Sequence, residues 1–195
     1  EILTAKPWYG AESARSYLGV WNRAFLEAEQ TADPLDRPVC SIEHAEQVTA
    51  RLLRMLVTRD EHFLSLARKY FNLAEILAIW KRMIGSGLIG GKSAGMLLAR
   101  AILERTDPRW SELLERHDSF YIGSDVFYTY LVRNGCWWIR QKQKNPATFL
   151  EGSEEARRRI LTGVFAADVR EEFTAMLDYF GQAPIIVRSS SLLED

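Results

Sequence analysis

The sequence predicts a mostly helical α+β protein with one small sheet. Apolar residues recur at helical spacing along most of the 195 residues. Only two short segments, 120–123 and 184–187, are candidate strands. We therefore expect more helix than strand, with a helical layer within residues 11–80.

Residues 1–80 predict a helical segment. Two apolar stripes are separated by a break from Asp33-Pro34 to Arg37-Pro38. Helical stripes of this kind indicate core packing rather than a groove for a cofactor. Their members are Ala14, Leu18, Trp21, Phe25 and Ala28 before the break, and Val48, Leu52, Met55 and Leu56 after it.

Two capping signals predict the next two helices. The stretch from Thr58 to Glu61 has the spacing of a capping box, and Asn72 is a favourable N-cap residue. The apolar faces of these helices would hold Phe63, Leu66 and Tyr70 in the first, and Ile76 and Trp80 in the second.

Helices and turns alternate through the rest of the chain. Asp107-Pro108 has the pattern of an N-cap and first helical residue, while Gly135 and Gly181 are typical stop signals. The pattern of residues 136–144 fits a helix and a loop equally well. We expect helices over about 94–104, 108–117, 124–134, 154–161 and 168–180, and a buried strand over 184–187.

The composition limits the functional classes. With 47% hydrophobic residues, 26% charged residues and a net charge of −1, the chain has no excess charge for binding nucleic acid. No stretch is apolar for the roughly 20 residues of a membrane span, and none of the given residues shows the pattern of a signal peptide. Cys40 and Cys136 lack metal-binding spacing and predict reduced, buried thiols in a cytoplasmic protein.

The C-terminal stretch carries the first candidate site. Arg188 and the three serines Ser189, Ser190 and Ser191 follow the apolar run of residues 185–187. A guanidinium group with neighbouring hydroxyl and backbone N–H donors is suited to binding a phosphate. The alternative is an arginine that makes only a surface ion pair.

A glycine-rich stretch, residues 85–95, carries the second candidate site. The glycines let backbone N–H groups approach a phosphate, and the following helix presents its positive N-terminus. Lys92 adds a cation and Ser93 adds a hydroxyl group. The alternative is a glycine-rich turn with a solvated lysine.

The spacing of this stretch excludes a Walker A loop. That loop has four residues between its two glycines and follows a strand. Counting back from Gly91-Lys92-Ser93 places Ser86 at the first glycine position, and residues 76–83 have helical character.

Both motifs, in this order, resemble the nucleotide-binding domain of pyruvate phosphate dikinase and phosphoenolpyruvate synthase. Residues 90–95, with the helix that follows, resemble its Gly-Gly-Lys-Gly/Ser-Ala motif, and residues 186–195 resemble its Val-Arg-Ser-Ser-x-x-x-Glu-Asp motif. Ser93 and Ser191 depart from the commonest residues of these motifs. The resemblance covers roughly residues 85–195, and it implies an ATP-grasp-like fold.

The resemblance implies that Lys92 and Arg188 contact the phosphates of ATP. Gly90, Gly91, Ser93, Ser189 and Ser190 complete the expected phosphate-binding set. In the family, phosphoryl passes from Mg²⁺-ATP to a histidine on a separate domain and then to an acceptor such as pyruvate. We accordingly expect residues 1–80 to be a helical segment and residues 81–195 to be the N-terminal part of the ATP-binding domain.

Among residues 1–195, none is expected to be catalytic or to bind a metal. In the family, the Mg²⁺ ligands lie in a later segment and the phosphate-carrying histidine lies on a separate domain. Residues 1–195 alone should therefore lack phosphotransferase activity. His44, His62 and His117 lack partner motifs, and the pair Trp137-Trp138 indicates core or interface packing. The sequence is compatible with a homo-oligomer as well as with a monomer. The alternative function is a non-catalytic regulatory or interaction module with a degenerate nucleotide-binding fold.

Overall fold

The structure, a computed structural model, describes residues 19–32, 42–115 and 118–189. The chain forms two compact units. The first unit contains the described residues of 1–83 and 88–121 together with Ser189, and the second contains residues 84–87 and 122–188. Each unit is therefore built from separate stretches of the chain.

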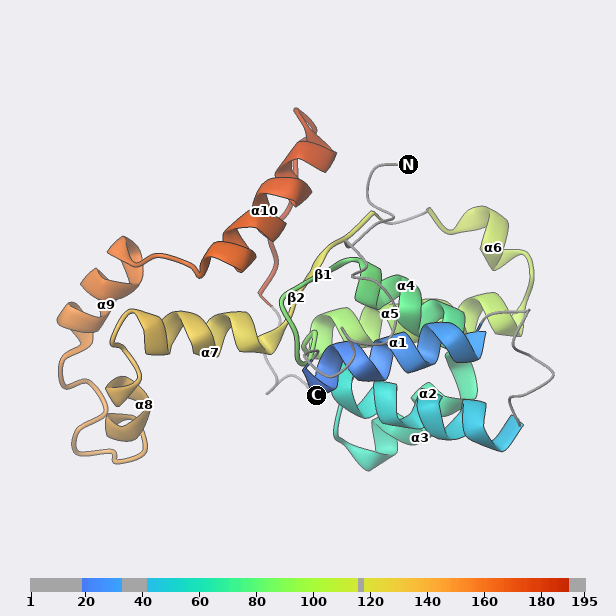
Figure 1. Ribbon diagram of the computed structural model, residues 1–195, viewed down its shortest axis with the longest axis horizontal. Coiled ribbons are helices and arrows are strands. Elements are labelled where there is room, and N and C mark those ends of the chain that lie inside the picture. Colours follow the sequence, from blue (N-terminus) through green and yellow to red (C-terminus); the bar gives the residue numbers. More distant parts are fainter. Residues whose placement is uncertain (1–18, 33–41, 116–117, 190–195) are drawn as a thin grey trace. The chain divides into compact units, whose positions relative to one another are not determined.

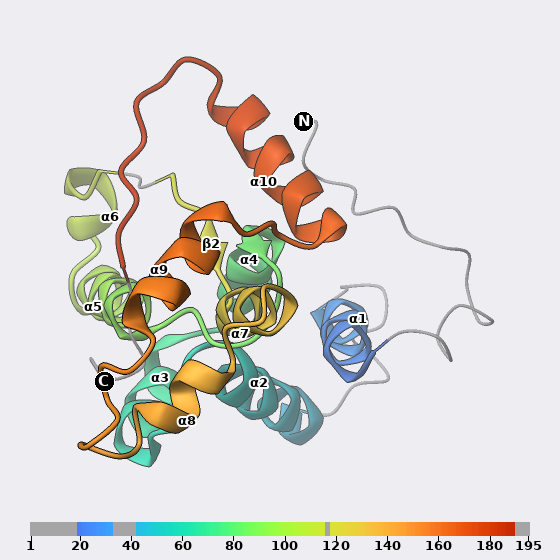
Figure 2. The ribbon, with the colours of Figure 1, turned by 90° about the vertical axis from the view of Figure 1, so that its left-hand side faces the viewer.

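The first unit is a layer of packed helices, as the sequence predicts (Figures 1 and 2). α1 contacts α2 and α4, α2 contacts α3 and α4, and α3 contacts α5. Helix accounts for most of its described residues. The helices are α1 Val20–Ala32, α2 Ile42–Leu56, α3 Glu61–Tyr70, α4 Leu73–Lys81, α5 Gly91–Thr106 and the short α6 Trp110–Leu113.

Apolar side chains from these helices form one core. The ring of Phe25 is fully buried and stacks on Trp80, with ring centroids 4.7 Å apart. Val48 and Leu52 lie buried on α2, as their spacing predicts, whereas Ala14 and Leu18 lie outside the described residues. Other fully buried members include Leu53, Leu56, Leu64 and Ile76.

Capping determines where α3 and α4 begin. The N-cap of α3 is Asp60, whose carboxylate accepts a hydrogen bond from the Phe63 N–H at 2.7 Å. The capping box expected at Thr58 is thus wrong by two residues, because the buried Thr58 hydroxyl instead accepts from the Asp60 N–H. On α3 the fully buried residues are Leu64 and Ala67 rather than Leu66, which is exposed.

Asn72 caps α4 as expected, and Glu75 completes a capping box. The Asn72 side chain accepts from the Glu75 N–H at 2.9 Å, and the Glu75 carboxylate accepts from the Asn72 N–H at 2.8 Å. Replacing Asn72 by alanine leaves a helix N–H group without this acceptor, so we expect a loss of about 1 kcal/mol in unfolding free energy. Chemical denaturation measures the loss, and an unchanged stability would contradict the capping role.

A two-stranded sheet joins β1, Met83–Ile84, to β2, Tyr121–Ile122. The Tyr121 N–H donates to the Arg82 carbonyl and the Gly123 N–H donates to the Ile84 carbonyl, each at 2.9 Å. Donor and acceptor both advance by two residues, so the strands are parallel. The candidate strand at 120–123 is confirmed. The helical character expected up to residue 83 is wrong, since α4 ends at Lys81 and β1 follows.

The second unit consists of helices around a small core. Ile84, Val126 and Val169 are buried, and Phe173 and Met176 pack against them. Val169, Phe173 and Met176 thus form the apolar face of the helix expected over 168–180, whereas Leu177 on the same helix is exposed. The helices are α7 Ser124–Arg133, α8 Trp138–Lys142, α9 Ser153–Thr162 and α10 Ala167–Phe180.

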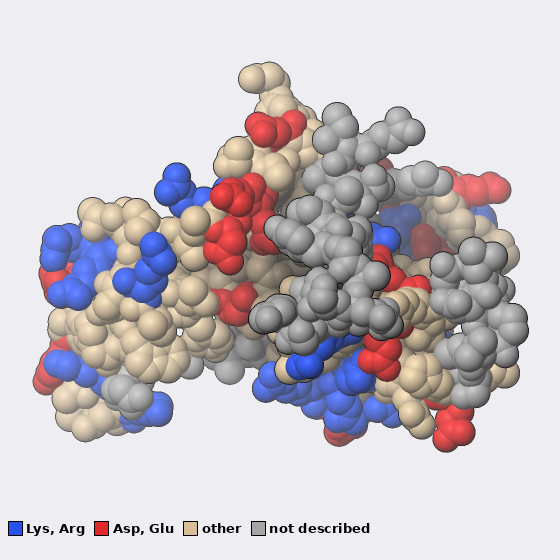
Figure 3. All heavy atoms as spheres, viewed as in Figure 1, with Lys and Arg blue, Asp and Glu red and all other residues tan. Residues whose placement is uncertain are grey.

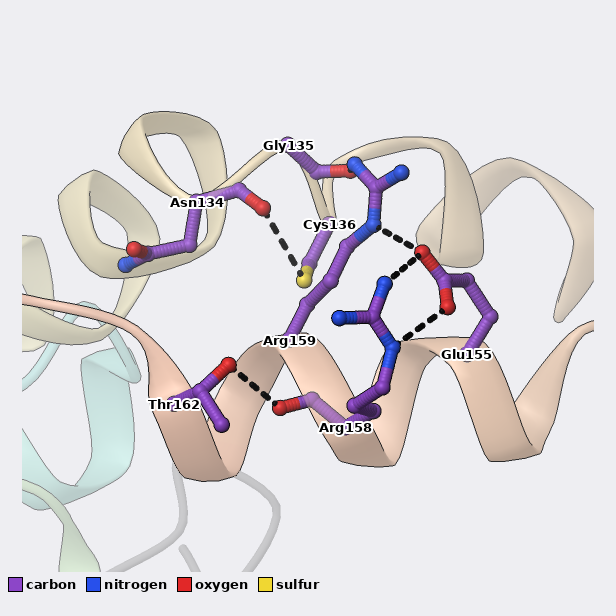
Figure 4. Close-up of polar contacts among 7 residues, drawn as sticks. All are labelled: Asn134, Gly135, Cys136, Glu155, Arg158, Arg159 and Thr162. Atoms are coloured by element: carbon purple, nitrogen blue, oxygen red, sulfur yellow. Dashed lines mark hydrogen bonds and ion pairs between the residues drawn. The ribbon is translucent and has the colours of Figure 1, made fainter.

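Charges gather by sign on the helices of the second unit. Figure 3 shows basic side chains over α9, which contains Arg157, Arg158 and Arg159, and acidic side chains over α10. Glu155 bonds to Arg158 and Arg159, and Arg159 also donates to the Gly135 carbonyl at 3.3 Å (Figure 4). The bond from Arg159, followed by that from Arg158, lowers the pKa of Glu155, and Glu155 raises the pKa of Arg159. This cluster connects α9 to the turn after α7.

The buried strand expected over residues 184–187 is absent from the described part of the chain. These residues belong to no helix or strand, and no described strand pairs with them. The side chain of Ile186 is 89% exposed and that of Val187 is 80% exposed. A β-branched run becomes a strand only where a neighbour supplies hydrogen bonds and an apolar surface, and local sequence does not encode that neighbour.

The observed bounds of two other helices differ from those expected. α5 begins at Gly91, three residues before the expected start, because glycine is tolerated in its first turn. α6 spans only Trp110–Leu113, and the Asp107 carboxylate accepts from the Arg109 N–H in the turn before it. Its expected end at His117 lies outside the described residues. Among the residues described, no helix combines the length and apolar character needed to cross a membrane.

Candidate functional site

The N-terminus of α5 contains four of the seven residues expected to bind phosphate. Gly90 is the N-cap residue, with φ of 81° and ψ of 159°, a conformation that favours glycine. It has no side chain that could cap the helix. Gly91 begins the helix, and the Ala94 N–H donates to the Gly90 carbonyl at 3.0 Å. The two glycines therefore form the start of α5, Gly90 as its N-cap residue and Gly91 as its first helical residue.

The first turn of α5 contains no acidic residue. The described helices α1 and α8 also lack one, whereas α2, α3, α4, α6, α7, α9 and α10 each carry an aspartate or glutamate in the first turn. Such a carboxylate compensates the positive end of a helix dipole. α5 is also the longest described helix, with 16 residues. Its N-terminus instead presents Lys92 and Ser93, which suits an external anion.

Lys92 is exposed and contacts the other candidate segment. Its Nζ atom donates to the backbone carbonyl of Ser189 at 3.2 Å. Both residues belong to the first unit, although they lie 97 positions apart. A carbonyl oxygen carries no net charge, so this bond does not itself neutralise the ammonium group. Ser93 is half-buried in the same turn.

The remaining expected residues lie at the end of the described chain. Arg188 and Ser189 are exposed, and Arg188 makes no ion pair or hydrogen bond with another described residue. Ser190 lies outside the described residues. Arg188 belongs to the second unit and Lys92 to the first, so a common cleft for these two cations stays a prediction.

The residue before Gly90 is firmly held in the first unit. Ile89 is buried, and its N–H donates to the carbonyl of Leu56 at the end of α2, at 3.0 Å. Burial of an isoleucine side chain contributes about 2 kcal/mol. The position from which the chain enters α5 is therefore fixed by the core.

A cavity of about 290 Å³ lies elsewhere in the first unit, between α4, α5 and β2. Its charged side chains are already paired: Arg82 with Asp118 at 2.9 Å, and Arg100 with Glu104 at 2.8 Å. None of the seven expected residues lines it. A cavity whose charges are matched internally offers little to a phosphate, so we do not assign the site there.

Tyr121 lines this cavity and has a perturbed pKa. Burial of the phenol raises the pKa of Tyr121 from its ordinary value of 10.0 to about 12, while nearby Arg82 opposes the change. The folded state thus favours the neutral phenol more than the unfolded chain does. The contribution of the neutral Tyr121 phenol to the unfolding free energy is fully present below pH 10, and it is lost as the pH rises through about 12.

We therefore expect the unfolding free energy to fall by about 2 kcal/mol between pH 10 and pH 12 on account of Tyr121. The measurement is chemical denaturation across this range, for the wild type and for Tyr121→Phe. The variant should show a smaller pH dependence. Equal slopes for the two proteins would show that Tyr121 does not titrate with folding.

No group of three or more histidine, cysteine, aspartate or glutamate residues among the described residues could hold a metal ion. Cys136 is a buried free thiol, and its sulfur lies 3.6 Å from the Asn134 carbonyl (Figure 4). The cation and hydroxyl donors at the N-terminus of α5 therefore stay the candidate ligand-binding groups among the described residues.

A glycine-initiated helix with lysine and serine in its first turn, and no carboxylate in that turn, has the features expected of an anion-binding site of the phosphate type. The family comparison agrees with this class. Residues 86–195 match the model of the pyruvate phosphate dikinase AMP/ATP-binding domain. The match spans more than half of the chain, so the chain belongs to this family, whose matched domain binds AMP or ATP. The comparisons with curated proteins and with solved structures found no match.

Proposed function

We propose that this chain is the ATP-binding part of a phosphotransferase resembling phosphoenolpyruvate synthase and pyruvate phosphate dikinase. The protein would transfer a phosphoryl group from Mg²⁺-ATP to a histidine on another domain, and from there to an acceptor such as pyruvate. The observation that carries the proposal is the N-terminus of α5, where Lys92 and Ser93 occupy a first turn without a carboxylate.

Lys92 and Arg188 would supply the two positive charges for the nucleotide phosphates. Both side chains are exposed, and Arg188 has no described ion-pair partner that would compete with a ligand. Hydrogen bonds from charged donors to phosphate are shorter and stronger than neutral ones. Ser93, Ser189 and Ser190 would add hydroxyl or backbone donors, and the glycines would let the phosphate approach the helix.

Catalysis by such a site is mainly positioning and charge neutralisation. A phosphoryl group in transfer carries charge on its equatorial oxygens, so fixed cations stabilise the transition state more than they stabilise free reactants. Mg²⁺ would arrive with the nucleotide and supply further charge neutralisation. The residues of this chain would bind and orient the phosphates, in a cytoplasmic protein whose Cys136 stays reduced.

The experiment supplies the protein that carries this chain with Mg²⁺ and ATP labelled at the β- or γ-phosphate. We expect an acid-labile, alkali-stable phosphoprotein, as a phosphohistidine would be, and label that moves to pyruvate when pyruvate is added. Nucleotide binding without phosphoprotein would support the alternative, a regulatory module. An absence of both binding and transfer would overturn the proposed function.

A further inference from the structure

The second unit leaves much of its apolar surface exposed. Most of the large hydrophobic side chains that are exposed in the described chain belong to this unit. Four of them lie within six successive residues, from the end of α9 to the start of α10, and clusters of this kind mark interaction surfaces. Leu161 is 69% exposed and Val164 is 55% exposed. We call Ile160, Leu161, Val164 and Phe165 the junction patch.

The junction patch is held by bonds to α7 of the same unit. The Asn134 side chain accepts from the Val164 N–H at 2.9 Å and donates to the Val164 carbonyl at 3.2 Å. The Tyr130 hydroxyl donates to the Ile160 carbonyl at 2.7 Å, and the rings of Tyr130 and Phe165 pack with centroids 4.5 Å apart. A surface that is ordered before it binds loses less conformational entropy on binding.

Opposite charges lie on the two helices that flank the junction patch. On α9, Arg157 is exposed and shares a face with Leu161, four positions later. On α10, the exposed side chains of Asp168, Glu171 and Asp178 share one face, since they are spaced by three and seven residues. None of these four charged side chains pairs with another described residue. The unit therefore does not use them to neutralise one another.

This arrangement is complementary to a second copy of itself. A basic helix, an apolar patch and an acidic helix follow one another along the chain, and both charged surfaces are visible in the single view of Figure 3. A two-fold axis through the patch would bring the two patches together and place α9 of each copy against α10 of the other. A polyanion such as nucleic acid, in contrast, would be repelled by α10.

We propose that the junction patch, with α9 and α10, is the surface through which two copies of this chain associate. The patch forms the apolar centre of the interface and the charged side chains form its polar rim. The rim also determines the orientation, because like charges would meet if α9 faced α9 or α10 faced α10. This surface belongs to the second unit alone, so the inference does not depend on the proposed nucleotide site.

The experiment measures self-association of the protein that carries this chain by sedimentation velocity. The variants are Arg157→Glu, Glu171→Lys and an equimolar mixture of the two. Each variant alone should associate about tenfold more weakly than the wild type, because like charges meet twice in each dimer. In the mixture, the two reversed charges attract each other and the two native charges still do. The mixture should therefore recover association of wild-type strength.

Two further variants separate this surface from general effects of charge and folding. Arg59→Glu is the matched control, since Arg59 is exposed on the first unit and pairs with no described residue. It should associate like the wild type. Leu161→Ser removes apolar area from the junction patch and should weaken association, while the melting temperature of the dilute protein stays nearly unchanged because Leu161 is exposed in the single copy.

Concentration dependence identifies what covers the surface. Hydrogen–deuterium exchange in peptides from residues 153–180 should slow as the protein concentration rises. Exchange that is slow at every concentration would show that another part of the same protein covers α9 and α10, and it would overturn the proposal. A wild type that is monomeric at about 100 µM, variants that associate like the wild type, or a mixture that recovers nothing would also overturn it.

Discussion

Lys92→Ala should weaken Mg²⁺-ATP binding by about 2 kcal/mol, or about thirtyfold, and leave folding stability nearly unchanged. The large effect follows from the loss of a charged donor at the N-terminus of α5, whose first turn contains no acidic residue. The small effect on stability follows from exposure, because Lys92 contributes little to the core. The measurements are calorimetric titration with Mg²⁺-ATP and thermal unfolding.

Arg188→Ala should weaken Mg²⁺-ATP binding by a similar amount. The Arg188 guanidinium group pairs with no described residue, so its donors can bind the phosphates. Lys144→Ala and Arg170→Ala are matched controls, because both side chains are exposed and neither pairs with a described residue. Both controls should bind ATP normally. If Lys92→Ala and Arg188→Ala also bound ATP like the wild type, the phosphate assignment would be abandoned in favour of the regulatory module.

The second large effect is expected for Gly123→Ala, which should destabilise the protein by about 3 kcal/mol. The new Cβ atom would lie 2.0 Å from the Ser86 carbonyl oxygen and 2.5 Å from the Ser86 carbonyl carbon. Both are backbone atoms, so no side-chain rotation relieves the overlap. Gly123 has an ordinary φ of −68°, and close approach rather than backbone conformation therefore requires glycine here. Chemical denaturation measures the loss.

Gly95→Ala is the matched control for this substitution. Gly95 lies inside α5, and a Cβ atom there meets nothing within 4 Å. Alanine is favoured over glycine in a helix interior, so this variant should be more stable by about 1 kcal/mol. A Gly123→Ala protein as stable as the wild type would show that the chain around Ser86 can move away, and that the close packing is not a constraint.

Local patterns were sufficient to predict most of the helices. Asn72 and Gly181 mark helix ends where they were expected, and the spacing of Phe25 and Trp80 predicted their burial. These features depend on residues within a few positions of one another. The resemblance of residues 85–195 to the nucleotide-binding domain was confirmed by the family match.

Features that depend on distant residues could not be predicted. Ser86 entered the sequence argument only as the residue that breaks the Walker A spacing, and Asp125 only as part of the helix expected over 124–134. Their mutual hydrogen bonds, and the bond from Gly85 to Glu172 across 87 positions, have no local signature. The glycines on either side of Ser86 indicate a turn, but they do not show which residues hold it. Likewise, residues 184–187 have strand character, but pairing depends on a neighbouring strand.

Hydrogen–deuterium exchange in the presence of saturating Mg²⁺-ATP tests the central claim most directly. It reports the backbone of the α5 start and of residues 185–189 in one experiment, without any substitution. We predict that nucleotide slows exchange in peptides covering residues 90–95 and 185–189, while peptides from α9 are unaffected. Saturating ATP that leaves both of these segments unchanged, or that protects only other parts of the chain, would contradict the assignment of the phosphate site to Lys92 and Arg188.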